Sequence, residues 1–185
     1  MTDADALAAW LLARRAGRPV EECGATAIFA AICGRAVTAE IQSRRVRQPT
    51  AREQRLMQAF RAPAVYERRG ILHAGPGMPV AETTAVLLPS RLPGNAGDLL
   101  GITGAGAAPP AASEVPLGRA LRGFGVRREP LEARLTPGAS DAAGEEQVIY
   151  SAARLWLGGP IALVTERVYR RFLTAFPGPW PESPR

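Results

Sequence analysis

The chain has 185 residues, of which 46% are hydrophobic and 22% charged. This composition excludes a disordered chain, a collagen and a disulfide scaffold, and it is typical of one globular domain. The 23 basic residues exceed the 17 acidic residues by six, and every basic residue is an arginine. We expect most of these arginines to be a compositional bias on the surface, and a few to bind carboxylate or phosphate through the planar guanidinium.

Cysteine and histidine usage limits the possible metal chemistry and location. Cys23 and Cys33 flank an apolar stretch at a spacing that favours neither a zinc site nor a disulfide framework, and the chain has one histidine. We therefore expect no metal. The acidic N-terminus and the lack of an apolar run of about 18 residues predict neither a secretory signal nor a transmembrane span. A cytoplasmic protein is expected.

Helical periodicity dominates the first part of the chain. A helix is predicted over residues 3–16 and a second over 26–33, each followed by a glycine. Residues 36–48 alternate with a period of two and predict a strand, which Pro49 ends. Thr50 and Glu53 then match a capping box, which predicts a further short helix.

Strand-like segments dominate the rest of the chain. Runs at 64–73 and 79–89 are separated by a Gly/Pro turn, and runs at 147–157 and 161–171 flank Gly158-Gly159-Pro160, so each pair predicts an antiparallel hairpin. The remaining expectations are a short helix, a strand and two loops. The first of the two loops is a candidate lid. Their ranges are 116–121 for the helix, 126–135 for the strand, and 93–112 and 136–145 for the loops.

This order of elements predicts the fold class. Helices come first and hairpin-linked strands follow, which indicates an α+β domain with an antiparallel β-sheet and flanking helices. The domain is expected to span residues 1–176, with a proline-rich tail at 177–185.

Strand alternation singles out one carboxylate. In the run 161–171, Glu166 shares a face with Val164 and Val168. A carboxylate on an apolar face is costly unless a cation or hydrogen-bond donors meet it, so Glu166 is a candidate general acid or base. The alternative is an edge-strand glutamate that reaches solvent.

The same reasoning applies to two consecutive arginines. Arg68 and Arg69 fall on opposite faces of the strand 64–73, so one of them points inward. An inward arginine near an inward Glu166 forms a compact anion pocket with a forked contact to a carboxylate. The alternative is a strand that displays solvated charge.

Tandem arginine pairs raise the possibility of a nucleic-acid surface. They are spread over many elements with few aromatic residues between them, so we favour a solvated surface and expect no nucleic-acid partner. The pairs lie at residues 14–15, 44–45, 68–69, 127–128 and 170–171.

Four fragments, taken in chain order, resemble the chorismate lyase family. The resemblance covers about residues 7–172, and its strength lies in the joint order and spacing of the fragments. They are Ala25-Thr26-Ala-Ile-Phe29, Arg69-Gly-Ile-Leu72 with the hairpin after it, Pro116-Leu117-Gly118, and Gly159-Pro-Ile-Ala-Leu-Val-Thr-Glu166.

The resemblance implies a chorismate lyase-like fold with an enclosed pocket and a cofactor-independent carbon–oxygen lyase. Such an enzyme converts chorismate to 4-hydroxybenzoate and pyruvate, and would serve ubiquinone biosynthesis. Arg69 would bind the ring carboxylate, Arg154 would give a second carboxylate contact, and Glu166 would assist proton movement near the ring hydroxyl. The remaining substrate-binding positions implied are the backbone amide of Leu117 and the backbone around Ala25 and Thr26.

A non-catalytic function is the alternative. The same fold serves as an effector-sensing domain in transcription regulators, which implies a binding domain for a small aromatic acid. Such regulators place a winged helix-turn-helix before the sensor, whereas about 25 residues precede the predicted Thr26 helix. In either case we expect a small-molecule partner and no membrane span. The oligomeric state is left open, with a monomer favoured.

Overall fold

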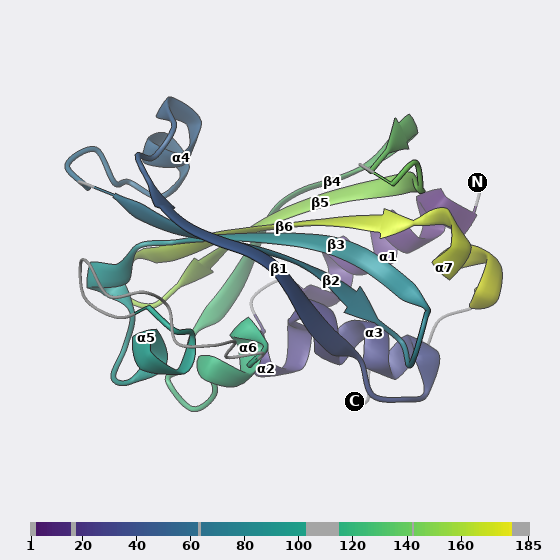
Figure 1. Cartoon of the computed structure of the whole chain (residues 1–185), viewed down its shortest axis with the longest axis horizontal. Coiled ribbons are helices and arrows are strands. Elements are labelled where there is room, and N and C mark those ends of the chain that lie inside the picture. Colours follow the sequence, from purple (N-terminus) through teal and green to yellow (C-terminus); the bar gives the residue numbers. More distant parts are fainter. Residues whose placement is uncertain (1–2, 16–17, 63, 103–114, 142, 179–185) are drawn as a thin grey trace.

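Six antiparallel strands form one sheet in the order β1-β2-β3-β6-β5-β4 (Figure 1). The computed structural model describes residues 3–15, 18–62, 64–102, 115–141 and 143–178. The strands are β1 (Thr38–Arg47), β2 (Val65–His73), β3 (Pro79–Leu87), β4 (Arg127–Ser140), β5 (Glu146–Trp156) and β6 (Pro160–Tyr169).

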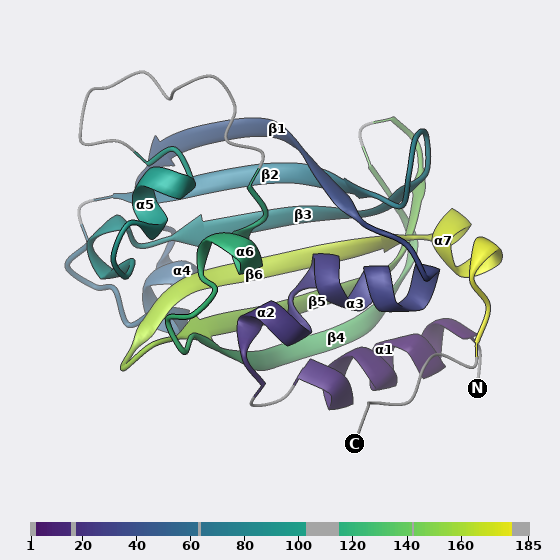
Figure 2. The same ribbon diagram turned by 90° about the horizontal axis from the view of Figure 1, so that it is seen from below.

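Most helices cover one face of this sheet, which confirms the predicted α+β class. Figures 1 and 2 show α1, α2, α3, α5 and α6 on that face, and α4 on the other side near one end. The five are α1 (Asp3–Arg15), α2 (Val20–Cys23), α3 (Ala25–Cys33), α5 (Ala96–Leu99) and α6 (Leu117–Ala120). The remaining elements are α4 (Ala51–Leu56), the 3₁₀ turn η1 (Pro89–Arg91) and α7 (Arg170–Ala175).

Alternation along β2 defines the two faces of the sheet. We call the face that carries Tyr66, Arg68 and Leu72 the helix-covered face, and the face that carries Glu67 and Arg69 the open face. Two apolar clusters lie between the helix-covered face and the helices. They are centred on Leu7, Leu11, Phe29, Val168 and Phe172, and on Tyr66, Leu87, Leu121, Leu155 and Ala162. A smaller cluster under α4 contains Met57, Val65, Val86 and Leu163.

Local signals explain several element ends. Gly34 adopts the left-handed conformation, with φ 65°, directly after α3 and ends it. At α4 both halves of the capping box form, because the Thr50 side chain accepts from the Glu53 amide and the Glu53 side chain accepts from the Thr50 amide. The predicted hairpins β2–β3 and β5–β6 also form.

Two predictions along the chain need correction. The segment 136–145 is not a loop, because β4 continues to Ser140. Its pairing with β5 shifts register between Leu135 and Ala139, so the strand accommodates the Pro-Gly pair in an irregularity where Gly138 has φ 74°. Within the predicted loop 93–112, residues 96–99 form α5, whereas 103–112 and the lid expected there lie outside the described residues.

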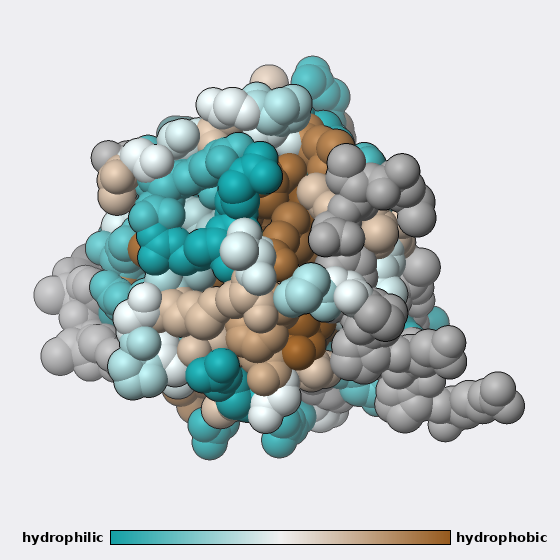
Figure 3. Space-filling view, turned by 90° about the vertical axis from the view of Figure 1, so that its right-hand side faces the viewer, coloured by the Kyte–Doolittle hydropathy of each residue, from teal (hydrophilic) through white to brown (hydrophobic). Residues whose placement is uncertain are grey.

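The ends of α1, β4, β5 and α7 meet at one end of the molecule. A groove there is lined by apolar residues from all four elements. Figure 3 views this end and shows a band of hydrophobic residues bordered by hydrophilic ones.

In the part of the chain that the structure describes, no helix is long and apolar enough to cross a membrane.

Candidate functional site

A pocket on the helix-covered face is lined by residues from the starts of α3 and α6 and from the sheet. Figure 2 shows α3 and α6 over this face of the sheet. Its empty volume is about 640 Å³, counting the open mouth. Most of its wall is apolar and comes from Val20, Ala25, Ala39, Ile41, Leu72, Ala85, Leu117, Leu155 and Val164. Gly70 lies in the floor, and a Cβ there would stand 2.4 Å from the carbonyl oxygen of Glu40, so this position accepts no side chain.

Arg68 provides a cation in this apolar pocket. The residue is 5% exposed, and its Nη1 donates a hydrogen bond of 2.7 Å to the carbonyl of Val115. Burial, followed by the like charge of its cross-strand neighbour Arg44, lowers the pKa of Arg68 to about 10. Arg68 is therefore still charged at neutral pH, and a bound anion would offset the cost of burying that charge.

Glu166 forms a buried ion pair at another side of the pocket. Arg128 Nη2 donates to both carboxylate oxygens at 3.0 and 3.1 Å, and the Ser151 hydroxyl donates to Oε2 at 2.7 Å. Each of the two charged side chains is 3% exposed. The pairing supplies the cation and the donor that an inward glutamate requires, and it neutralises the glutamate charge within the protein.

The structure brings four of the predicted site residues together. Glu166, Ala25, Thr26 and Leu117 all line the pocket. Ala25 and Thr26 are there because α3 begins over the sheet, and Leu117 because α6 begins on the opposite side of the opening.

The structure corrects the placement of the other two, Arg69 and Arg154. Arg69 lies on the open face, where its side chain is 47% exposed and its Nε donates to Glu67 at 2.9 Å. Arg154 also lies on the open face and donates to Glu129 at 2.7 and 3.0 Å and to the carbonyl of Leu56 at 2.9 Å. Strict alternation places both away from the pocket, whereas the sequence resemblance had assigned both to it.

Sequence reasoning missed Arg128 and Ser151, and left Arg68 as one of two options. Alternation contains the signal for Arg68, because it shares its face with Tyr66 and Leu72. Arg128 belongs to an arginine pair that we expected on the surface. Nothing local marks it, since its partner lies 38 positions away in the chain and is brought close by the β4-β5-β6 order.

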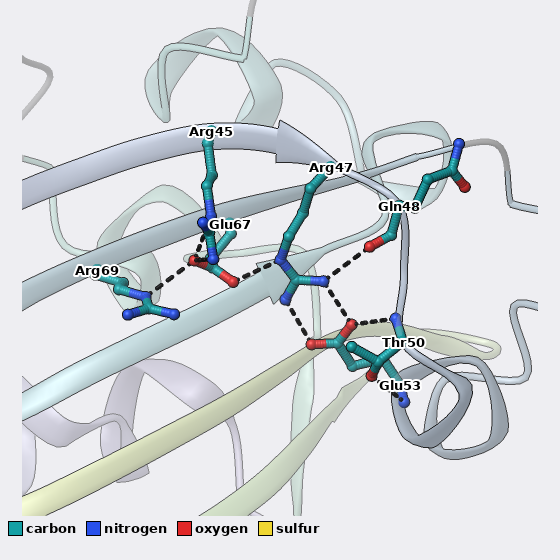
Figure 4. A network of polar contacts seen from close by, with 7 residues as sticks. All are labelled: Arg45, Arg47, Gln48, Thr50, Glu53, Glu67 and Arg69. Atoms are coloured by element: carbon teal, nitrogen blue, oxygen red, sulfur yellow. Dashed lines mark hydrogen bonds and ion pairs between the residues drawn. The ribbon is translucent and has the colours of Figure 1, made fainter.

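The open face holds a separate polar network, centred on Glu67 (Figure 4). Its carboxylate accepts hydrogen bonds from Arg45 at 2.8 Å, Arg47 at 2.6 Å and Arg69 at 2.9 Å. Arg47 also forms a two-bond contact of 2.7 and 2.6 Å with Glu53 at the start of α4. Burial alone would raise the pKa of Glu67, but the Arg47 hydrogen bond and the charges of the three arginines outweigh it, so this pKa lies below its usual range.

Among the residues with described positions, no group of three or more His, Cys, Asp or Glu side chains is placed to hold a metal ion.

Known proteins resemble this chain in structure but not detectably in sequence. No family model matches it, and no curated protein matches its sequence. PhnF from Mycobacterium smegmatis superposes with a TM-score of 0.52 at 13% identity, over 77% of this chain and 62% of PhnF. The ligand-binding domain of a putative GntR-family transcriptional regulator from Bordetella bronchiseptica gives 0.51 at 16% identity, over 80% of this chain and 91% of that one.

A third structure agrees with these two. The C-terminal domain of the histidine utilization repressor from Pseudomonas syringae pv. tomato str. DC3000 gives a TM-score of 0.50 at 10% identity, over 80% of this chain and 99% of that domain. The chain has the effector-domain fold of GntR-family regulators. At these identities the likeness concerns the fold alone. The chain spans about three fifths of PhnF, and it matches the separate ligand-binding domain and the separate C-terminal domain over most of their length.

These structures overturn the prediction of an enzyme. The solved structures named above include the ligand-binding domain of a GntR-family transcriptional regulator and the C-terminal domain of a repressor, so the predicted chorismate lyase activity and its place in ubiquinone biosynthesis are wrong. The site geometry agrees with this correction. Arg69, assigned to hold the substrate, lies outside the pocket, and Glu166, assigned to move protons, is bound to Arg128 and Ser151.

Proposed function

We propose that this chain is a binding domain that takes a small organic acid into the pocket and leaves it chemically unchanged. The observation that carries the proposal is the charged Arg68 buried in an apolar pocket. A buried guanidinium forms strong charge-assisted hydrogen bonds with an anion in an apolar surrounding, so a pocket of this kind favours an anionic occupant. The likeness to ligand-binding domains of regulators supports sensing as the purpose of binding.

The pocket also limits the size and charge of the ligand. Because Arg128 is paired with Glu166, we assign the contact with the ligand to Arg68, and one guanidinium favours a single carboxylate. Arg68 and Glu166 stand two residues apart along the strands and two strands apart across the sheet, so their backbones are separated by roughly 12 Å. We propose a hydroxybenzoic acid between them, with its carboxylate at Arg68 and its ring hydroxyl donating to Glu166.

The test compares two consecutive arginines. Calorimetric titration of the purified chain with benzoate and 4-hydroxybenzoate is expected to show saturable binding, tighter for the hydroxylated acid. Arg68→Met removes the charge-assisted contact and should weaken binding roughly tenfold or more. Arg69→Met, the matched control on the open face, should leave the affinity within a factor of about two. Equal losses in both variants would contradict the proposed pocket.

A second measurement separates binding from turnover. After prolonged incubation with the protein, the bound acid should be recovered with its mass unchanged. A time-dependent product that disappears in Arg68→Met would contradict a purely binding function.

A further inference from the structure

The open face carries a row of three aligned side chains that the pocket does not use. Arg134 on β4 pairs across the sheet with Tyr150 on β5, and Tyr150 pairs with Arg167 on β6. Directly paired residues of antiparallel strands project on the same side, so an arginine flanks the tyrosine on each side. The guanidinium carbons lie 5.0 Å and 5.6 Å from the centroid of the Tyr150 ring, within the range of a cation–π contact.

A third arginine reaches the same place from outside the sheet. Arg52, on α4, lines a groove together with Arg134, Tyr150 and Arg167. The empty volume of this groove is about 850 Å³, counting open solvent, and its wall contains no carboxylate among the described residues. Arg52 and Arg134 are 63% and 60% exposed, so their guanidinium groups are accessible to a ligand.

The nearest carboxylates leave this groove with excess positive charge. Glu132 is shared, at 2.9 Å from Arg52 and 3.7 Å from Arg134. Glu82, the cross-strand neighbour of Arg167, instead accepts a hydrogen bond of 2.8 Å from the Gln147 amide. Arg52 and Arg134 therefore share one carboxylate, Glu132, and no ion pair joins Arg167 to a carboxylate among the described residues, so the groove keeps an excess of positive charge.

We propose that this groove is a second ligand site, which binds a phosphate group through Arg52, Arg134 and Arg167. The phosphate dianion is attracted by this excess positive charge, and its oxygens accept the parallel N–H bonds of guanidinium groups. Tyr150 is the platform that orients two of the arginines. The source of the phosphate is either the free ion or a small phosphate monoester. This site is independent of the carboxylic acid pocket on the other face.

To test this site, the full chain is titrated at low salt with inorganic phosphate, methyl phosphate or sulfate, and binding is measured by calorimetry. Saturable binding of the dianions is expected, and Arg167→Gln and Arg134→Gln should each weaken it roughly tenfold. Arg122→Gln removes an exposed arginine from the turn after α6 and should leave the affinity unchanged. Binding of methyl phosphate identifies a monoester site, whereas binding of inorganic phosphate without methyl phosphate restricts the site to the free ion.

Lowering the pH distinguishes a dianion site from general attraction to a basic protein. The second pKa of a phosphate monoester is about 6, so methyl phosphate should bind more weakly at pH 5 than at pH 7.5, while sulfate stays a dianion and should bind equally. Absence of saturable binding, or an equal loss in Arg122→Gln, would overturn the site. Arg68→Met should leave phosphate binding intact, so this result stands or fails separately from the carboxylic acid pocket.

Discussion

Arg68 and Arg69 are neighbours in the chain, yet they lie on opposite faces of the sheet in different environments. Arg68 is buried under the helices, among apolar side chains and with its pKa lowered to about 10. Arg69 is half-exposed on the open face and shares Glu67 with two other arginines. The same residue type therefore binds a ligand, as we propose, on one face, and belongs to a surface network on the other.

The glutamate beside the pocket, Glu166, and the glutamate of the open-face network, Glu67, differ in the same way. Glu166 is held by one guanidinium, Arg128, and both side chains are almost fully removed from water. Glu67 is held by three arginines, at least two of which reach solvent. Water screens the charges of the Glu67 network but not those of the Glu166–Arg128 pair. Removing a charge should therefore cost far more unfolding free energy on the helix-covered face.

The largest expected effect comes from breaking the buried pair. Arg128→Met leaves the Glu166 carboxylate buried without its main counter-charge, and should lower the free energy of unfolding by about 3–5 kcal/mol in urea denaturation. Arg69→Gln on the open face should lower it by no more than about 1 kcal/mol. Replacing both members of the buried pair by leucine should restore much of the loss, because no lone charge then remains. Similar losses in Arg128→Met and Arg69→Gln would remove the contrast between the faces.

A smaller effect is expected at the centre of the open-face network. Glu67→Gln should lower the free energy of unfolding by about 2 kcal/mol at pH 7, because the arginines Arg45, Arg47 and Arg69 then face each other without their shared carboxylate. Urea denaturation of the wild type and of Glu67→Gln at pH 7 measures this difference in unfolding free energy.

The acid dependence of Glu67 has a defined sign. Its folded pKa lies below the ordinary value of about 4.3, so its contribution is present above that pH and is lost as the pH falls through the folded pKa. The wild type should therefore lose more stability than Glu67→Gln between about pH 5 and pH 2. Parallel losses in the two proteins would show that Glu67 is not the titrating group.

The smallest effect concerns the attachment of α4 beside this network. Thr50→Ala removes the hydroxyl that accepts from the Glu53 amide, and should cost about 1 kcal/mol of unfolding free energy. Thr50→Ser keeps the cap and serves as the control. A loss in both variants would assign the effect to packing rather than to the hydrogen bond.

Much of the fold was accessible from the sequence, because it depends on local signals. The capping box at Thr50, the glycine after α3 and the Gly-Gly-Pro turn between β5 and β6 predicted their elements correctly. The prediction of a loop at 136–145 was wrong for a physical reason. Proline and glycine, here Pro137 and Gly138, ordinarily interrupt strands. Here pairing with β5 resumes beyond them at an irregularity, and pairing partners are not encoded locally.

The sequence by itself determined the α+β class and the alternation that sends Arg68 and Arg69 to opposite faces, because both follow from periodicities of two and 3.6 residues. It also marked Glu166 as a glutamate that needs a partner. The tertiary structure decided that Arg128 is that partner, that Arg68 and not Arg69 lines the pocket, and that Arg134, Tyr150 and Arg167 form a row. These outcomes depend on strand order and register, which bring together residues far apart in the chain.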